Sequence, residues 1–399
     1  MTALSDLGPQ PPAPDAHRPI LSVEDLRVHF HTDVGVVPAV DGVTFSVAQG
    51  ETLAVVGESG SGKSVTGMSL LGLLPKPAAK IPTGAIYWRG EDLIGKSESQ
   101  LRKIRGREIA MIFQDPLTSL NPVMTGGKQI VEMIRLHLDV GRREAKDRAL
   151  DMLQAVGIPE ARRRFDMYPH EFSGGMRQRA MIAMAISCDP ALIIADEPTT
   201  ALDVTVQAQV MDVLAEVQER TGAAMILITH DLGVVAGTAD RVMVMYAGRQ
   251  VETAATDPIF YANRHPYTLG LMASLPRADT DSVLGEGETA RLKPIDGQPP
   301  SLLHRPTGCA FHPRCELAKL PSPCATDVPE LLAVAPGHLS ACHFADDLAG
   351  RARDAGSQYV EVVELAGFAG VDESAGETAV ASPSGPSGVT GVNGEADRG

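Results

Sequence analysis

The sequence predicts an α/β fold, in which a largely parallel β-sheet is covered by helices. The first observation behind this prediction is an alternation of short apolar runs, which are typical of buried strands, with longer stretches of helical spacing between residues 20 and 257. The second observation is a glycine-rich segment that joins the first apolar run directly to a helical stretch. The strand-like runs lie at residues 52–56, 109–113, 191–195 and 225–229.

Composition divides the 399-residue chain into four parts. Residues 1–19 contain five prolines among small and polar residues and should form a flexible arm, because they cannot bury enough apolar surface to offset the entropy of ordering. Residues 20–257 should form the α/β core. Residues 258–344 are rich in Pro, His and Cys and should form a small cysteine-rich C-terminal extension, and the acidic residues 345–399 should be a disordered tail.

Charge and hydropathy exclude several classes of protein. The formal net charge of −15 argues against a general nucleic-acid binder that relies on phosphate contacts, so no nucleic-acid partner is expected. No apolar run reaches the ~18 residues of a membrane-spanning helix, and the proline-rich start lacks the pattern of a signal peptide. We therefore expect a cytoplasmic protein with 44% hydrophobic residues, enough for a substantial core.

The strongest chemical signal is the segment at residues 57–64, which fits the phosphate-loop pattern GxxxxGK[ST] between a strand and a helix. Its glycines let successive N–H groups point at phosphate oxygens, Lys63 can bridge the β- and γ-phosphates, and Ser64 can ligate Mg²⁺. The alternative is an ordinary glycine-rich turn. The candidate nucleotide-binding residues are Gly57, Ser59, Gly60, Ser61, Gly62, Lys63, Ser64 and Val65.

Two carboxylates follow the apolar run at residues 191–195. In a parallel sheet the end of this strand lies close to the phosphate loop, so Asp196 can hold the Mg²⁺ shell. Glu197 lies one residue further out, where it can act as general base toward the attacking water. The alternative for this pair is a solvated turn after a core strand.

A third signal, Ser173-Gly174-Gly175, stands before a helical stretch and forms a second candidate anion site. The order of the phosphate loop, Gln114, Ser-Gly-Gly, Asp196-Glu197 and Thr229-His230-Asp231 resembles the nucleotide-binding subunit of ABC transporters. The resemblance implies a P-loop ABC ATPase core with a helical subdomain at about residues 115–188. It also implies that the Ser-Gly-Gly element closes on ATP bound to a partner subunit, although Phe172 and Met176 depart from the usual Leu and Gln.

Further positions match the family singly. Gln114 resembles the residue that touches Mg²⁺ and the attacking water, His230 resembles the histidine that contacts the γ-phosphate, and Asp203 resembles the loop that couples two sites across the dimer. Phe30 resembles the aromatic residue that stacks on adenine, although a core phenylalanine is nearly as good an interpretation. The expected catalytic residues are thus Glu197, His230, Gln114 and Lys63, with Ser64, Gln114 and Asp196 at Mg²⁺.

Beyond the core, the stretches 257–276 and 305–315 resemble the C-terminal extension of oligopeptide and dipeptide importer ATPases. The resemblance implies a peripheral subunit at the cytoplasmic face of the membrane that drives peptide uptake through two permeases, fed by an extracytoplasmic binding protein. Because the chain has one phosphate loop, a second ATPase subunit is expected, and a non-identical one is favoured. The alternatives are an importer of nickel or another small solute, a soluble ABC ATPase that acts on DNA or ribosomes, and a P-loop kinase.

Four of the five cysteines are spaced C-x5-C-x8-C-x17-C. These gaps are wider than the short pairs of most zinc sites, so a [4Fe–4S] cluster is favoured over zinc, and unligated thiols are the third possibility. Zinc could also use His312, His338 or His343. Cys188 stands apart and should be a buried core thiol. The four candidate ligands are Cys309, Cys315, Cys324 and Cys342.

Overall fold

The computed structural model describes residues 19–199, 204–274 and 295–348. Residues 1–18 and 349–399, which hold almost all of the predicted arm and tail, lie outside these ranges. Helices lie between the parallel strands of the largest sheet along the chain, which confirms the α/β prediction.

The largest sheet in the described part of the chain has eight strands in the order β12-β13-β11-β10-β3-β9-β8-β7. Strands β10, β3, β9, β8 and β7 are parallel, whereas β11, β12 and β13 add antiparallel strands at one edge. The four strand-like runs of the sequence are all strands of this sheet. The bounds are β3 Thr52–Val56, β7 Ile109–Ile112, β8 Leu192–Asp196, β9 Ala224–Thr229, β10 Arg241–Tyr246, β11 Arg249–Ala255, β12 Leu332–Ala335 and β13 His338–Ser340.

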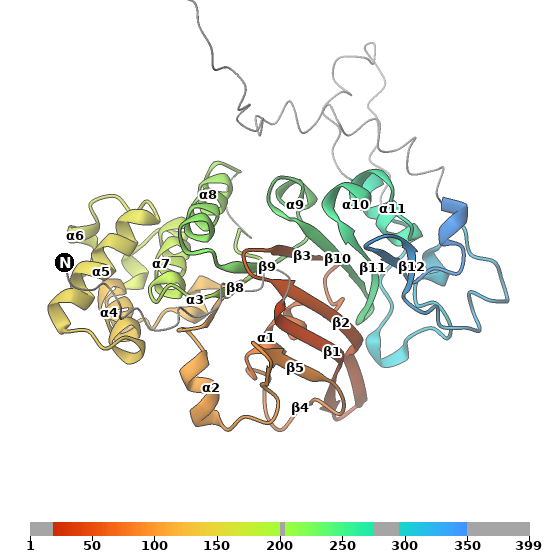
Figure 1. The fold of residues 1–399 in the computed structure, drawn as a ribbon, viewed down its shortest axis with the longest axis horizontal. Coiled ribbons are helices and arrows are strands. Elements are labelled where there is room, and N and C mark those ends of the chain that lie inside the picture. The colour runs from red at the N-terminus through yellow and green to blue at the C-terminus, as the bar shows by residue number, and fades with distance from the viewer. Residues whose placement is uncertain (1–18, 200–203, 275–294, 349–399) are drawn as a thin grey trace, which may run out of the picture.

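A smaller antiparallel sheet packs against the main one and is seen below it in Figure 1. It contains the long hairpin of β1 and β2, with β4 and β5 both paired to β1 and β6 paired to β5. The bounds are β1 Pro19–Thr32, β2 Gly35–Ala48, β4 Ala79–Lys80, β5 Ala85–Trp88 and β6 Glu91–Asp92.

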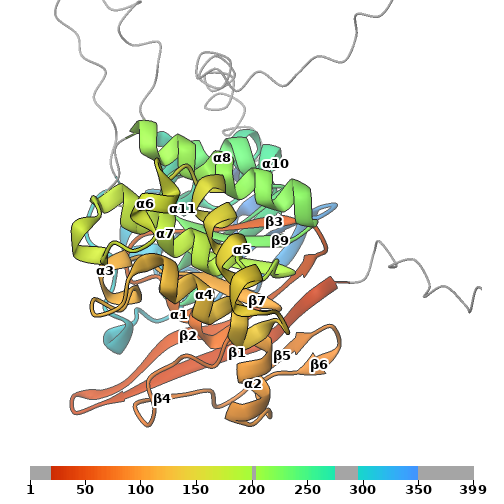
Figure 2. The ribbon, with the colours of Figure 1, turned by 90° about the vertical axis from the view of Figure 1, so that its left-hand side faces the viewer.

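Helices cover the main sheet, and helices α4 to α6 extend to the end of the molecule opposite β12 (Figures 1 and 2). The segment between β7 and β8 is helical throughout most of its length. The bounds are α1 Lys63–Leu70, α2 Glu98–Ile104, α3 Pro116–Ser119, α4 Gly126–His137, α5 Arg142–Ala155, α6 Ala161–Arg164, α7 Gly174–Ile186, α8 Val204–Thr221 and α9 Leu232–Thr238.

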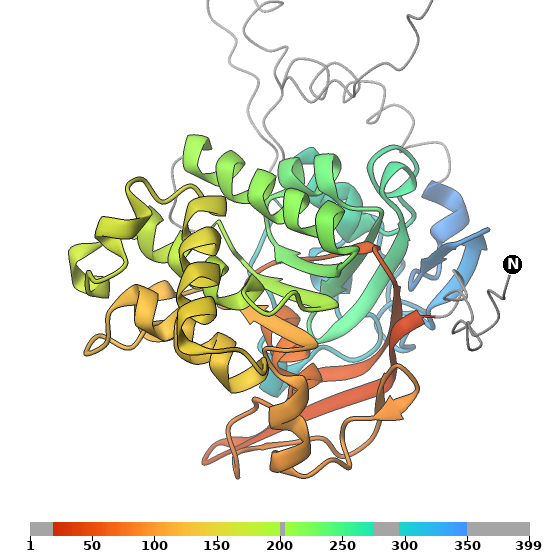
Figure 3. The same ribbon diagram turned by 60° about the vertical axis from the view of Figure 1, so that its left-hand side comes forward.

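The main sheet is buried on both faces, and this explains the continuous apolar run in β8. Successive side chains of a strand point to opposite faces, so a strand covered on both faces is apolar at consecutive positions, as residues 192–195 are. Ile193 and Ala195 pack into the core formed with α4, α5, α7 and α8. Leu192 and Ile194 pack into a second core with α1 and the smaller sheet, which lies on the face opposite α8 (Figure 3).

The C-terminal region, defined here as residues 256–348 of the described chain, packs on the β10–β11 side of the main sheet. Its core includes Tyr246, Tyr267 and Phe311, whose ring centroids lie 4.6 to 5.4 Å apart. Leu348 is buried, four residues beyond the predicted boundary at 344. The elements are α10 Thr256–Tyr261, α11 Pro266–Ala273 and the 3₁₀ turns η2 Leu302–His304, η3 His312–Arg314 and η4 Ala345–Leu348.

Candidate functional site

The glycine-rich loop between β3 and α1 has a backbone that only glycine can adopt at two positions. Gly57 and Gly62 have φ angles of 149° and 102°. A Cβ atom at Gly57 would lie 2.2 Å from the carbonyl oxygen of Met245, and one at Gly62 would lie 2.5 Å from that of Ala39. The loop is therefore wrapped tightly between neighbouring strands, which exposes its N–H groups at the start of α1.

The side chains of this loop offer hydrogen-bond donors. The Lys63 ammonium donates to the carbonyl oxygens of Gly57 and Glu58 at 2.7 and 3.0 Å, and Lys63 is only 6% exposed. Burial lowers the pKa of Lys63, although nearby carboxylates oppose the shift. The buried Ser61 hydroxyl has no hydrogen-bond partner among the described residues. A buried cation, an unpartnered hydroxyl and a helix N-terminus together suit a phosphate group.

Asp196 and Ser64 meet at the end of β8. The Ser64 hydroxyl donates to the carboxylate of Asp196 at 2.9 Å, and Asp196 is 5% exposed. Burial raises the pKa of Asp196, although the hydrogen bond from Ser64 and the charge of Lys63 oppose the shift. A hydroxyl and a carboxylate side by side are oxygen donors of the kind that Mg²⁺ prefers, so these residues fit that ion.

Glu197 lies where β7, β8 and β9 end. Its carboxylate accepts a hydrogen bond from the Gln114 amide at 2.7 Å and lies 3.4 Å from Nδ1 of His230. The φ angle of Glu197 is 47°, a left-handed conformation that costs a non-glycine residue on the order of 1 kcal/mol or more. Because parallel strands bring their carboxyl ends to one edge of the sheet, Gln114 and His230 both lie beside the carboxylate of Glu197 although they are distant from it in sequence.

The Ser-Gly-Gly element forms the N-terminus of α7. The Ser173 hydroxyl accepts a hydrogen bond from the backbone N–H of Met176 at 3.3 Å and caps the helix. A Cβ at Gly174 would meet no atom within 4 Å, so this N-terminus is open on that side. Phe172 is 3% exposed and packs into the core of the helical region, which explains how a larger residue than Leu is accommodated.

Three other residues of the predicted nucleotide site make no hydrogen bond to the residues described above or lie outside the described ranges. Phe30 lies on β1 opposite Val37 of β2 and is partly buried against the core beneath the smaller sheet. Val65 is partly buried in the same core, within α1. Asp203 lies outside the described residues.

Comparison with known proteins agrees with this geometry. The sequence profile described as ABC transporter matches residues 40–200, and the profile described as oligopeptide/dipeptide transporter, C-terminal region, matches residues 251–321. The chain is 50% identical over 323 residues to a probable peptide ABC transporter ATP-binding protein of Sinorhizobium fredii, which covers 81% of this chain and 94% of the relative. This chain belongs to the family of ABC transporter ATP-binding proteins.

A second relative and a solved structure support the assignment. The dipeptide transport ATP-binding protein of Bacillus subtilis is 52% identical over 296 residues, which is 74% of this chain and 86% of that protein. A dimeric ATP-binding cassette in a post-hydrolysis state, bound to ADP and phosphate, matches with a TM-score of 0.54 at 25% identity and covers 59% of this chain and 98% of the cassette. The chain therefore has the ABC ATPase cassette fold, and the described part contains no helix long and apolar enough to span a membrane.

Sequence reasoning missed the contacts between the cassette and the C-terminal region, among them two that involve Glu58. The Arg314 guanidinium binds both carboxylate oxygens of Glu58, in the phosphate loop, at 2.6 and 2.9 Å. The backbone N–H of Glu58 donates to the phenol oxygen of Tyr267 at 2.8 Å, and Tyr267 is fully buried. More than 200 residues separate the partners in sequence. The one signal in the sequence was Arg314 itself, which follows Phe311 and His312 and could have suggested an acidic partner elsewhere in the chain.

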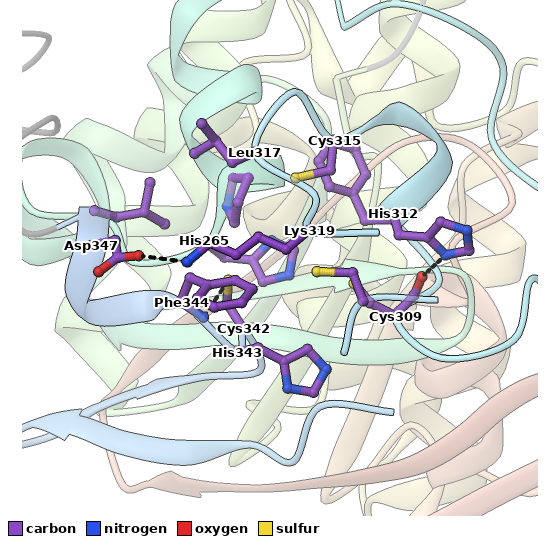
Figure 4. Close-up of a pocket in the computed structure, with 14 residues that line it drawn as sticks. His265, Cys309, His312, Cys315, Leu317, Lys319, Cys342, His343, Phe344 and Asp347 are labelled. Atoms are coloured by element: carbon purple, nitrogen blue, oxygen red, sulfur yellow. Dashed lines mark hydrogen bonds and ion pairs between the residues drawn. The ribbon is translucent and has the colours of Figure 1, made fainter. Parts of the chain in front are cut away.

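The four clustered cysteines line one cavity of about 140 Å³ at the edge of the C-terminal region. Figure 4 shows the thiols of Cys309 and Cys315 pointing toward the same space. Burial raises the pKa of Cys315 to about 11 and that of Cys342 to about 12. Within the described ranges, however, no three Cys, His, Asp or Glu side chains are arranged to hold a metal ion.

The histidines named as possible zinc ligands have other partners. His338 is buried and lies 2.7 Å from the carboxylate of Glu252. Nδ1 of His312 lies 2.9 Å from the carbonyl oxygen of Cys309, and His343 lies 2.9 Å from that of Asp327. Cys188 is a buried free thiol, and burial raises its pKa.

Proposed function

We propose that this chain is the ATP-hydrolysing subunit of an importer that takes up peptides through partner permeases. The main support is that four side chains meet at the carboxyl edge of the parallel sheet: Lys63, Ser64, Asp196 and Glu197. The names of the relatives and the match of the C-terminal region support the peptide assignment. An importer of nickel or another small solute is the alternative, and a soluble ABC ATPase without a transport role is the less favoured one.

In this proposal the phosphate loop holds the β- and γ-phosphates. Backbone N–H groups of the loop and the Ser61 hydroxyl donate to phosphate oxygens, and Lys63 leaves its two carbonyl partners to bind the phosphates. Ser64, Asp196 and Gln114 would hold Mg²⁺, which neutralises developing charge on the phosphates when it is bound.

Glu197 would act as the general base. Its carboxylate is held by Gln114 and faces His230, so it is oriented before substrate arrives. We assign to Glu197 the alignment and deprotonation of the attacking water, and to His230 a hydrogen bond to the γ-phosphate. Gln114 then links the base to the Mg²⁺ position.

The open N-terminus of α7 supports a second subunit in this scheme. Ser173, Gly174 and Gly175 make no hydrogen bond to the chain's own phosphate loop in the described residues, so they are free to close on ATP held by a partner. Asp203 is proposed to couple the two sites. A related but non-identical ATPase is the favoured partner, with two permeases and an extracytoplasmic binding protein completing a complex at the cytoplasmic face of the membrane.

We also propose that the cysteine cavity binds a metal group. The four thiols share one cavity in a small cysteine-bearing extension, which supports a [4Fe–4S] cluster or zinc. The described side chains are not arranged around one ion, so no step of ATP hydrolysis is assigned to such a group. Iron and zinc analysis of anaerobically purified protein tests the proposal, and protein free of both metals would contradict it.

Uptake measurements test the transport function. Cells that lack this chain should lose uptake of labelled di- and oligopeptides, and the wild-type chain should restore it, whereas Glu197→Gln should not. Loss of nickel uptake with normal peptide uptake would favour the alternative importer. Normal uptake of both would contradict a transport role.

A further inference from the structure

A cavity of about 550 Å³ opens beside the phosphate loop, and it is built by segments that lie far apart in the sequence. One side is the β1–β2 hairpin, including Thr32 and Val37, and the base is residues 58–61 of the phosphate loop. The rest of the lining is Tyr246 and Ala247, where β10 ends, and residues 299–303 of the C-terminal region. The volume lies within the range of small-ligand sites.

The character of the lining changes across this cavity. Near the phosphate loop it offers small polar residues and backbone, which suit phosphate groups. Away from the loop it offers Val37, the prolines at 299 and 300, and the two leucines at 302 and 303, which suit a flat, largely apolar group. Phe30 lies directly across the strand pair from Val37, on the same face of the hairpin. A molecule with phosphates at one end and an aromatic base at the other matches this gradient.

The C-terminal side of the cavity is fixed to the cassette by specific contacts. Arg305 donates to the carboxylate of Asp41 on β2 at 2.5 Å and to the carbonyl oxygen of Pro38 at 3.0 Å. Arg305 and Asp41 are 12% and 10% exposed, so this ion pair is largely shielded from water. A Cβ added to Gly35 would lie 3.0 Å from Leu303, which shows how closely the turn η2 packs on the hairpin.

We propose that residues 299–303 form one wall of the nucleoside site, so that the C-terminal region contacts the base and ribose of ATP bound by the phosphate loop. This inference rests on the proposed ATPase function. Leu303, the last residue of the wall, joins it to the cassette, because it lines the cavity and lies close to Gly35 of the β1–β2 hairpin. The wall contributes affinity for the nucleoside and none for the phosphates.

Calorimetric titration of ADP and of pyrophosphate, each with Mg²⁺, tests the inference in the full-length chain. Leu303→Ala should weaken ADP binding about threefold to tenfold, because it removes apolar contact area, and should leave pyrophosphate binding unchanged. Leu332→Ala is the matched control: Leu332 is in the same region, is 59% exposed and does not line the cavity. It should leave both affinities unchanged.

Hydrogen exchange provides a second readout that does not depend on a variant. ADP should slow amide exchange at residues 301–305 of the wild-type chain, whereas pyrophosphate should not. Unchanged ADP affinity in Leu303→Ala, or an equal loss for ADP and pyrophosphate, would overturn the wall. If the wild-type chain binds neither ligand, the proposed ATPase function itself fails, whereas Lys63→Ala should weaken both ligands if that function is right.

Discussion

Replacing Arg314 by Met should destabilise the protein, because it removes the ion pair between the C-terminal region and the phosphate loop. The guanidinium makes two charge-assisted hydrogen bonds to Glu58 and donates to the carbonyl oxygen of Asp296 at 2.9 Å. Arg314 is 6% exposed and Glu58 is 26% exposed. Breaking a buried ion pair costs about 3–5 kcal/mol, and the partial exposure of Glu58 places the expected loss near the lower end, about 3 kcal/mol.

A double-mutant cycle with Glu58→Gln separates the ion pair from the other contacts of Arg314. Glu58→Gln alone should lower the free energy of unfolding by about 1–2 kcal/mol. The loss in the double variant should be smaller than the sum of the two single losses by about 1–2 kcal/mol. The measurement is urea unfolding followed by far-UV circular dichroism. Arg143→Met is the control, since Arg143 is exposed on α5, and it should change the free energy of unfolding by less than about 0.5 kcal/mol.

Two outcomes would refute this reasoning. A loss below about 1 kcal/mol in Arg314→Met would mean that the contact does not hold the C-terminal region on the cassette. Strict additivity in the cycle would mean that Arg314 stabilises the fold through the carbonyl contacts and not through the charge of Glu58.

Three other predictions concern catalysis, acid stability and the chain terminus. Glu197→Gln should lower steady-state ATPase activity at least about 100-fold while ATP still binds, because the amide keeps its shape but cannot accept a proton, and near-normal turnover would contradict the assignment. Although burial of Asp41 opposes the shift, hydrogen bonds from Arg249 and Arg305 lower its pKa below 3.8, so the stability it contributes is present above that pH and is lost as the pH falls further. Asp41→Asn should therefore be less stable than wild type at pH 7, with a smaller difference at pH 3, in thermal unfolding. Truncation after Leu348 should leave the melting temperature within about 2 °C of wild type, whereas truncation after Phe344 should lower it, because it removes the buried Ala345 and Leu348; equal melting temperatures would contradict the packing of η4.

The sequence by itself was sufficient for the central strands and for the residues at their ends. Residues 192–195 of β8 are apolar at every position because both faces of a parallel strand are buried, and that pattern is local. The glycines at 57 and 62 are equally local signals, since the backbone of the loop demands them. The parallel-sheet argument placed Asp196 and Glu197 beside the phosphate loop, whereas Gln114 and His230 were identified by resemblance to the family, and the structure has both next to Glu197.

The contacts between the cassette and the C-terminal region were decided only by the tertiary structure. Nothing near Glu58 in the sequence indicates that Arg314 will bind it, because an ion pair between segments 256 residues apart leaves no periodicity or spacing. The wall at residues 299–303 reaches the phosphate loop for the same reason, since its position depends on how η2 packs on the hairpin. The cysteines show the same dependence on tertiary structure. Their spacing indicated a cluster, and the four thiols do line one cavity. Their relative orientation depends on how the loops that carry them pack, which the spacing does not determine.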